Sequence, residues 1–407
     1  MNDFVVFGGK KLVGEIELQG SKNALLPVIF ASVVIDGVSV ISNVADIGDV
    51  NVAIEIIEQL GAIVQRKGST LIIDTRNLEY KKIECDLTSK IRASSYLIGA
   101  CLSRFGIFHI SKFGGCNFCN RPIDMHIFAA SMLGAEFDGE IIKADKLKGK
   151  KIEFKKRSVG ATINALIMAS VAEGETVIEC AAKEPHVRVL VDFLLSAGAD
   201  IEEKNDSFLV RGSKLKNGKV NIVPDMIEAG TFLLLAPITE GKITVKKSSG
   251  LELDSFLEPL SDSGVTVVKD FSDITVYGVP ERPIMIKTAP HPGYPTDLQP
   301  QMAPLMAKYF GGRIFENVWQ NRFSYLSALS PFGVNFCNNQ NKAIILPSKL
   351  HNAQTISPDL RGGAAALMCA LTSFGESIIE NADMILRGYE KIAQKLGSLG
   401  ADISMRD

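Results

Sequence analysis

The stretch Asp359-Leu-Arg-Gly-Gly-Ala-Ala-Ala-Leu-Met-Cys-Ala-Leu-Thr-Ser-Phe-Gly-Glu-Ser-Ile-Ile-Glu380 contains the pattern that decides the fold. A segment of small and apolar residues runs from Arg361 towards Gly375, and a β-branched strand follows that glycine. The segment is apolar on nearly every side, which is typical of a helix that is buried all round. Such a helix needs strands and other helices to cover it.

The chain contains this pattern six times. In each copy an apolar helix runs into a glycine and then a strand, and a second, amphipathic helix ends in another glycine before the next strand. Successive first glycines are 64 to 70 residues apart, which is too long for a common solenoid repeat. The first glycines are Gly37, Gly106, Gly174, Gly241, Gly311 and Gly375, and the second are Gly61, Gly134, Gly198, Gly264, Gly333 and Gly400.

Six buried helices divide naturally into two domains of three, so the predicted fold class is α/β with two domains. We expect residues 22–222 to form one domain, and residues 1–21 with 223–407 to form the other, so that the first residues complete a sheet of the second domain. The amphipathic helices, such as those predicted over 50–60 and 389–399, should cover the outside.

Charged residues stand where the buried helices should begin. Counting back 14 residues from each first glycine gives positions 23, 92, 160, 227, 297 and 361. Lys22, Arg92 and Arg361 are at or beside these starts, although a basic side chain there opposes the helix dipole. Helix N-termini with basic side chains suit phosphate or carboxylate groups. The sequence therefore predicts an anion-binding cleft.

The segment Lys112 to His126 combines a thiol with flexible backbone and has the composition of a catalytic loop. Two glycines precede Cys116, and Pro122 suits the first position of a helix, which would put Arg121 beside unpaired N–H groups. An incidental thiol in a surface loop is the simpler alternative. A metal site at Cys116 and Cys119 is disfavoured because no second Cys/His pair follows at ligand spacing. A redox pair is disfavoured because Phe-Gly-Gly-Cys does not follow a thioredoxin-like strand pattern.

Composition excludes several other classes of protein. The chain has 407 residues, 46% hydrophobic and 22% charged, with a net charge of −2, which argues against a general nucleic-acid or membrane-surface protein. The first residues lack the pattern of an export signal. The longest apolar run, residues 24–35, is shorter than the ~20 residues of a membrane span. The seven cysteines are scattered along the chain, which is typical of reduced thiols. We expect a cytoplasmic protein. The basic run 143–157 is either a nucleic-acid patch or, as we favour, a solvated strand pair.

Eight motifs in order resemble the UDP-N-acetylglucosamine 1-carboxyvinyltransferase family over essentially the whole chain. The motifs are Gly20-Ser-Lys-Asn-Ala24, Ile91-Arg-Ala-Ser94, Gly114-Gly-Cys116 with Arg121-Pro-Ile-Asp-Met-His126, Ser158-Val-Gly-Ala-Thr162, Tyr294-Pro-Thr-Asp-Leu-Gln299, Asn321-Arg-Phe323, Asp359-Leu-Arg361 and Arg387-Gly-Tyr-Glu390. The resemblance implies an inside-out α/β barrel of six βαβαββ-type repeats in two domains, with the active site in the interdomain cleft.

It also implies transfer of the enolpyruvyl group of phosphoenolpyruvate to the 3′-hydroxyl of UDP-N-acetylglucosamine, with release of phosphate, at the committed step of peptidoglycan synthesis. By resemblance Cys116 is the acid, or the thiol that forms a covalent adduct with phosphoenolpyruvate, and Asp297 is the base. The resemblance also implies that no metal or cofactor is needed and that fosfomycin is an inhibitor. The phosphoenolpyruvate residues would be Lys22, Asn23, Arg121, Arg322, Arg361 and Arg387. The sugar-nucleotide residues would be Arg92, Arg121, Pro122, Ile123, Asp124, Met125, Lys156, Arg157, Ser158, Val159, Asp297 and Val318. We expect a monomer.

The sequence departs from the family pattern at three places. Phe118 and Cys119 replace Ile and Gly after the thiol, Met226 replaces an arginine, and the phrase before Arg322 is less acidic. Alternatives are therefore a paralogue with another acceptor, such as another UDP sugar or shikimate 3-phosphate, and a nucleotide-binding module without activity. The related 5-enolpyruvylshikimate-3-phosphate synthases lack the cysteine loop and differ over residues 23–26.

Overall fold

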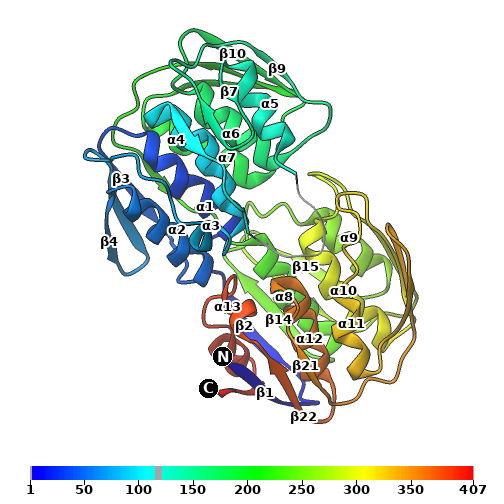
Figure 1. Ribbon diagram of the computed structural model, residues 1–407. Coiled ribbons are helices and arrows are strands. Elements are labelled where there is room, and N and C mark those ends of the chain that lie inside the picture. Colours follow the sequence, from blue (N-terminus) through cyan, green and yellow to red (C-terminus); the bar gives the residue numbers. More distant parts are fainter. Residues whose placement is uncertain (1, 115–121, 407) are drawn as a thin grey trace. The chain divides into compact units, whose positions relative to one another are not determined.

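The computed structural model describes residues 2–114 and 122–406 (Figure 1). These residues divide into two compact units. The first unit consists of residues 20–114 and 122–223, and the second consists of residues 2–19 and 224–406. Each unit contains three of the six copies of the repeat and has its own hydrophobic core.

The six apolar segments form helices that begin within one residue of the positions expected from the sequence. Two of them open with a short 3₁₀ turn before the α-helix. The six are α1 (Lys22–Ala31), η2 (Arg92–Tyr96) with α4 (Leu97–Phe105), α6 (Val159–Ala169), α8 (Met226–Ile238), η3 (Thr296–Leu298) with α10 (Gln299–Lys308), and α12 (Leu360–Thr372). Nearly every residue of α8 and α12 is buried, as an all-round apolar helix requires.

The second helices are shorter than the pattern predicted in two copies. Most run for nine to twelve residues, but α11 is a single turn, and the helix expected over 389–399 begins only at Ile392 because Lys391 adopts a left-handed conformation (φ 50°). These helices are α2 (Gly48–Gln59), α5 (Asp124–Met132), α7 (Pro185–Ser196), α9 (Asp254–Asp262), α11 (Leu326–Leu329) and α14 (Ile392–Ser398). Four short turns complete the set: η1 (Ser32–Val34), α3 (Cys85–Thr88), η4 (Ser330–Phe332) and α13 (Asp383–Leu386).

The glycines that end these second helices adopt one conformation. All six have φ between 87° and 103°, in the left-handed region that an L side chain rarely enters. Each glycine turns the chain from a helix into a strand, which explains why this signal recurs in every copy.

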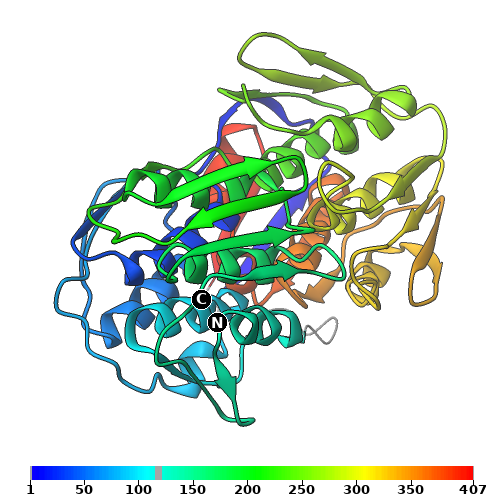
Figure 2. The same cartoon turned by 90° about the horizontal axis from the view of Figure 1, so that it is seen from above.

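The first unit contains three sheets, one in each copy. Their strand orders are β13 (Lys219–Asn221), β3 (Val38–Ser42), β5 (Thr70–Asp74) and β4 (Ile63–Lys67); β6 (Ile107–His109), β8 (Ile141–Lys143) and β7 (Glu136–Phe137); and β11 (Asp200–Lys204), β12 (Ser207–Arg211), β10 (Glu175–Glu179) and β9 (Lys151–Glu153). Figure 2 shows the third of these sheets as green arrows over the helices of its unit, where α6 contacts β10 and β12.

The second unit also contains three sheets, and the first strands of the chain belong to two of them. The orders are β15 (Thr266–Lys269), β16 (Ile274–Tyr277), β14 (Lys242–Lys246) and β2 (Val13–Glu17); β17 (Ile284–Lys287), β18 (Gly312–Phe315), β20 (Lys342–Leu346) and β19 (Asn335–Asn338); and β21 (Gln354–Ile356), β22 (Gly375–Glu380), β1 (Asp3–Gly8) and β23 (Asp402–Arg406).

Each four-stranded sheet has one parallel pair at its edge, and these pairs explain how the chain passes between the units. In three copies the strands before and after a buried helix pair in parallel, for example β9 and β10 around α6. The two remaining pairs are exchanged: β2, which precedes α1, pairs with β14, while β13, which precedes α8, pairs with β3. The chain therefore leaves a unit directly after an edge strand, at two points.

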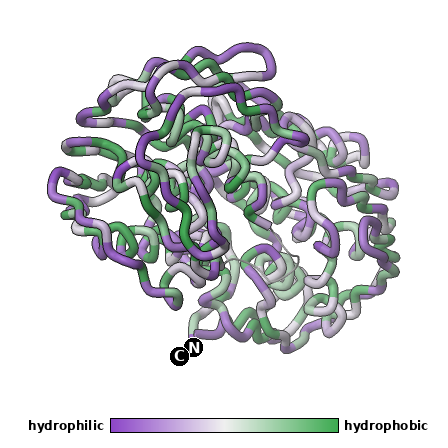
Figure 3. Tube along the Cα trace, turned by 45° about the horizontal axis from the view of Figure 1, so that its top comes forward, coloured by the Kyte–Doolittle hydropathy of each residue, from purple (hydrophilic) through white to green (hydrophobic). Residues whose placement is uncertain are grey.

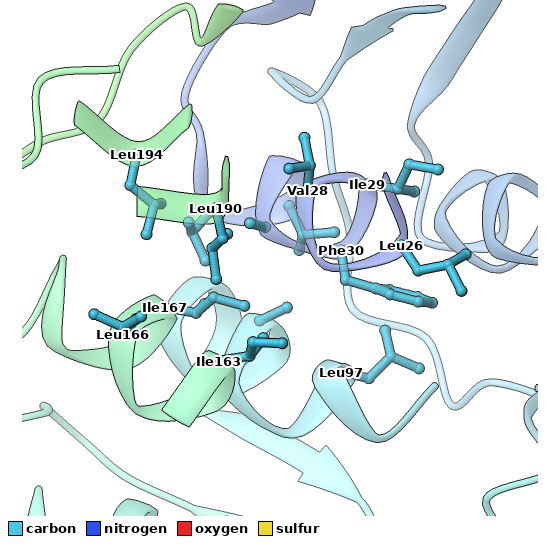
Figure 4. Packing of buried hydrophobic residues seen from close by; sticks show 14 of the residues in the cluster. Leu26, Val28, Ile29, Phe30, Leu97, Ile163, Leu166, Ile167, Leu190 and Leu194 are labelled. Atoms are coloured by element: carbon cyan, nitrogen blue, oxygen red, sulfur yellow. The ribbon is translucent and has the colours of Figure 1, made fainter. Parts of the chain in front are cut away.

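The core of the first unit packs apolar side chains from four helices. In Figure 4 Leu190 of α7 lies beside Ile167 of α6, and the ring of Phe30 of α1 lies on the side of Leu97 of α4. In the second unit α8, α10 and α12 contact one another in the same way. Hydrophobic and hydrophilic stretches alternate along the trace in Figure 3, as the succession of buried helices and polar turns requires. Within the described residues, every helix is too short or too polar to cross a membrane.

The close approach of α4 and α6 leads to a test of this packing. A Cβ added at Gly99 would lie 2.5 Å from Oδ1 and 3.0 Å from the backbone oxygen of Asn164, so we expect Gly99→Ala to destabilise the fold by about 1–3 kcal/mol. A Cβ added at Gly397 in α14 would meet no atom outside its own helix backbone within 4 Å, so Gly397→Ala should stabilise the fold by about 0.5 kcal/mol. Urea unfolding of both variants measures the difference, and equal effects would contradict the close approach.

Candidate active site

Three residues predicted for the site meet around one carboxylate in the second unit. Asp297 lies in η3 at the start of a buried helix, and its Oδ1 accepts a hydrogen bond from Nη2 of Arg322 at 2.8 Å. Its Oδ2 accepts from Nη2 of Arg361 at 3.2 Å. The arginine side chains are only 6% exposed, whereas that of Asp297 is 30% exposed. The triad Asp297–Arg322–Arg361 therefore presents its carboxylate, and not its guanidinium groups, to solvent.

Arg361 is bonded to Tyr389, which is itself bonded to two other buried helices. Its Nη1 donates to the hydroxyl of Tyr389 at 3.1 Å, and its guanidinium lies 5.6 Å from the centre of that ring. The same hydroxyl is 2.9 Å from Oγ1 of Thr231 in α8 and 3.2 Å from Nε2 of Gln301 in α10. Tyr389 was predicted as part of an outer helix, and this prediction is wrong: the ring is buried at the start of α12.

The six buried helices differ in whether a side chain accepts hydrogen bonds from their first backbone N–H groups. Asp225 caps α8, Asp359 caps α12 and Ser158 caps α6, each by a side-chain oxygen. No side-chain cap is present at α1, η2 or η3. Three of the six starts thus already bind a side-chain oxygen of the chain itself, and the binding of anions at the helix starts stays a prediction.

A buried glutamate anchors the turn that carries Arg387. Glu228 is 1% exposed; its Oε2 accepts from the backbone N–H of Gln19 at 2.7 Å and its Oε1 from Nζ of Lys395 at 2.6 Å. The amide of Gln19 donates to the oxygen of Gly388 at 2.8 Å and accepts from the N–H that follows Tyr389 at 2.6 Å. This cluster fixes residues 388–390 next to Arg387, whose own Nη1 lies 4.0 Å from Sδ of Met384.

In the first unit Lys22 forms a nearly buried ion pair. Its Nζ is 2.6 Å from Oδ2 of Asp49 at the start of α2, and the two side chains are 11% and 4% exposed. Removing either partner would leave a buried charge, so the pair holds the amine at the start of α1 beside the half-buried Asn23. No local sequence signal indicates Asp49 as the partner of Lys22.

Arg92 reaches the segment that follows the cysteine loop. Its Nη2 donates to the backbone oxygen of Pro122 at 3.5 Å. Pro122 was predicted at the first position of a helix, but α5 begins at Asp124 with Ile123 as its N-cap residue. The prediction is wrong by two residues, because Ile123 (φ −105°, ψ 12°) is not yet helical. Asp124 is exposed and Met125 half-buried, so both side chains are accessible.

His126 links the start of α5 to α4 and α6 through a neutral ring. Its Nδ1 is 2.6 Å from Nδ2 of Asn164, whose Oδ1 accepts from the N–H of Gly99 at 2.7 Å. Burial, with a smaller contribution from the positive charge of Arg92, lowers the pKa of His126 to about 3. A Cβ at Gly160 would lie 2.8 Å from Cε1 of the ring, so α6 begins close against it.

The remaining predicted residues lie on more open surface. Lys156 and Arg157 are exposed, Val159 and Val318 are half-buried, and Arg157 forms an ion pair with Asp206 at 2.5 Å. Within the basic run, Lys146 pairs with Glu173 and Lys151 with Glu179, which favours the solvated strands over a nucleic-acid patch. Cys116, Cys119 and Arg121 lie outside the described residues. The five described cysteines are free thiols.

Comparison with known proteins identifies the class and then the family. The family profile of EPSP synthase (3-phosphoshikimate 1-carboxyvinyltransferase) matches residues 6–396. Among solved structures, the enolpyruvyl transferase NikO from Streptomyces tendae superposes with a TM-score of 0.88 at 24% identity, over 100% of this chain and 99% of its own. EPSP synthase from Acinetobacter baumannii gives 0.76 at 16% identity, over 100% of each chain. The fold is thus that of the enolpyruvyl transferases, an α/β class of transferases, as the sequence predicted.

Curated relatives narrow the class further. UDP-N-acetylglucosamine 1-carboxyvinyltransferase of Halothermothrix orenii is 37% identical over 99% of both chains. UDP-N-acetylglucosamine 1-carboxyvinyltransferase 3 of Caldanaerobacter subterraneus subsp. tengcongensis is 40% identical, also over 99% of both. The chain belongs to the UDP-N-acetylglucosamine 1-carboxyvinyltransferase family.

The buried glutamate predicts how stability should depend on pH. Burial raises the pKa of Glu228 to about 7, although Lys395 and the N–H of Gln19 oppose this shift. Its contribution to stability is therefore complete below the unfolded pKa of about 4.5 and is lost as the pH rises through about 7, by at most about 3 kcal/mol. Urea unfolding from about pH 5 to about pH 8 should show this loss in the native protein and not in Glu228→Gln. Parallel pH curves for the two proteins would contradict it.

Proposed function

We propose that this protein transfers the enolpyruvyl group of phosphoenolpyruvate to the 3′-hydroxyl of UDP-N-acetylglucosamine and releases phosphate, the committed step of peptidoglycan synthesis. Membership of the family over the full chain supports this proposal. The observation that supports it most within the molecule is the triad Asp297–Arg322–Arg361, in which an accessible carboxylate is held by two buried guanidinium groups.

The chemistry needs an acid, a base and several cations. Protonation of the methylene carbon of phosphoenolpyruvate generates an oxocarbenium-like centre at the adjacent carbon, which the sugar hydroxyl attacks as it loses its proton. In this proposal the thiol of Cys116 supplies the proton and Asp297 accepts the proton of the hydroxyl. Phosphate then leaves the tetrahedral adduct. We propose that Asp297, once it has released its first proton, takes a proton from the newly formed methyl group, which restores the enol ether.

Cationic side chains would bind the anionic groups of both reactants. We assign Lys22, Arg121, Arg322, Arg361 and Arg387, with the amide of Asn23, to the phosphate and carboxylate of phosphoenolpyruvate. The sugar nucleotide would contact Arg92, residues 121–125, residues 156–159, Asp297 and Val318. These residues come from both units, and we propose that domains 22–222 and 1–21 with 223–407 enclose the reactants together.

The location and assembly of the protein belong to the same proposal. The free thiols of the described cysteines suit a reducing compartment, so we infer that the reaction occurs in the cytoplasm. We propose that the protein acts as a monomer and uses no cofactor.

Acceptor specificity is the direct test of the function. With phosphoenolpyruvate present, UDP-N-acetylglucosamine should trigger phosphate release, whereas shikimate 3-phosphate and other UDP sugars should not. A coupled phosphate assay run with the acceptors in parallel measures this. Activity only with shikimate 3-phosphate would favour the function in the name of the matching family profile, and nucleotide binding without any turnover would favour a binding module.

The two loop thiols provide a second test. Cys116→Ala should abolish turnover and leave binding of UDP-N-acetylglucosamine intact, because the nucleotide contacts are other residues. Cys119→Gly restores the family residue and should leave activity equal or higher. Fosfomycin should label Cys116 alone, faster in the presence of the sugar nucleotide, as mass spectrometry can show. If both substitutions are equally damaging, the pair is a metal or redox site instead.

A further inference from the structure

Glu316 is a buried carboxylate to which the mechanism above gives no role. It follows strand β18 directly and is 1% exposed. Burying a carboxylate costs several kcal/mol unless hydrogen bonds replace its water, so a glutamate at this position requires an explanation. Four donors provide that replacement, and each comes from a segment near the triad.

The two carboxylate oxygens of Glu316 bind different parts of the chain. Oε1 accepts from the backbone N–H of Val318 at 2.9 Å, from that of Trp319 at 3.0 Å and from Oγ1 of Thr288 at 2.8 Å. Oε2 accepts from Oγ1 of Thr296 at 2.9 Å. Thr288 also accepts from the N–H of the residue after Glu316, at 2.9 Å, which closes the turn.

These bonds connect the two sides of the ion triad. Thr296 is the residue before Asp297 in η3, and the turn 317–319 leads to Arg322, which donates to Asp297. Val318, the predicted apolar contact to the sugar, is itself held through its N–H. Because Glu316 is bonded to both segments, it fixes the distance between the carboxylate of Asp297 and the guanidinium of Arg322.

We propose that Glu316 is a positioning residue that sets the geometry of Asp297 through Thr296 and of Arg322 and Val318 through the turn 317–319. This inference rests on the proposed function for its kinetic consequences, but the connection itself is independent of it. A misplacement of about 1 Å in a reacting group can reduce the rate about 100-fold. Accurate placement of Asp297 and Arg322 therefore explains why a buried charge is present at Glu316 although its burial is unfavourable.

The protein contains its own reporter for this connection. Trp319 is the only tryptophan in the chain, and its backbone N–H donates to Glu316. Indole fluorescence and its quenching by acrylamide therefore report on the turn 317–319 without any substrate. The two halves of the connection are separable, because Thr296→Val removes only the bond towards Asp297, whereas Glu316→Ala removes all four.

Thr296→Val is the decisive variant. We expect kcat to fall about 10-fold, with the KM values for both substrates within about 2-fold and with unchanged Trp319 quenching. The matched control is Thr244→Val, which removes the hydroxyl pair of Thr244 and Thr275 (2.8 Å) between β14 and β16 of the same unit and should leave kcat unchanged.

Substitutions at Glu316 complete the experiment. Glu316→Ala should lower kcat about 100-fold and increase acrylamide quenching of Trp319. Glu316→Gln keeps an acceptor oxygen for the two backbone N–H groups, and the hydroxyl oxygen of Thr296 can accept a hydrogen bond from the new amide N–H. We therefore expect kcat of this variant to lie within about 3-fold of the native value. Equal damage from Gln and Ala would overturn the connecting role, as would native kcat in Thr296→Val.

The readouts also separate this inference from the proposed function. If the native protein shows no turnover with phosphoenolpyruvate and UDP-N-acetylglucosamine, the function is wrong, while Trp319 quenching still tests the connection. If Glu316→Ala fails to fold, as circular dichroism would show, the comparison of Thr296→Val with Thr244→Val decides the question alone. Unchanged quenching in a folded Glu316→Ala would contradict the connection.

Discussion

The structure depends on the need to cover six helices that are apolar all round. A helix such as α8, buried over nearly its whole length, is stable only when other elements remove every face from water. Three such helices in one unit can cover one another only in part, so sheets and outer helices must close around them. The start of a buried helix needs polar groups nearby, because its first N–H groups require partners. Burial of the helices and the position of the polar residues are therefore consequences of the same constraint.

This constraint explains which parts of the fold were predictable from the sequence. The six helix starts, from Lys22 to Leu360, were found within one residue because an apolar segment and its closing glycine are local signals. The left-handed glycines, such as Gly198 at φ 99°, were predictable for the same reason. Errors occurred where local signals compete: Pro122 suits a helix start, but the backbone of Ile123 delays the helix, and Lys391 interrupts the helix expected from 389.

The candidate site was predictable only in its charged members. Asp297, Arg322 and Arg361 were expected together through family resemblance, and the structure joins them. Their supporting contacts were missed because the partners are far apart in sequence. Gln19 bonds residues more than 200 and 350 positions away, and helix α10 and strand β18 separate Thr296 from Glu316. The sequence around Glu316 has no local feature that distinguishes it from a solvent-exposed glutamate after a strand. No spacing rule identifies such pairs, because hydrogen-bond geometry and not periodicity decides them.

Several buried charges of the second unit hold separate segments of the chain in place. Glu228, Glu316 and Arg361 each would destabilise the fold if left without partners, and each is instead bonded to two or more separate segments. An apolar side chain could fill the same volume at lower cost, but it could not fix the distance between two loops, because hydrophobic contacts are not directional. A site that must hold a carboxylate and several cations in defined positions needs directional contacts. The buried polar network therefore gives precision to a fold whose stability comes from its apolar helices.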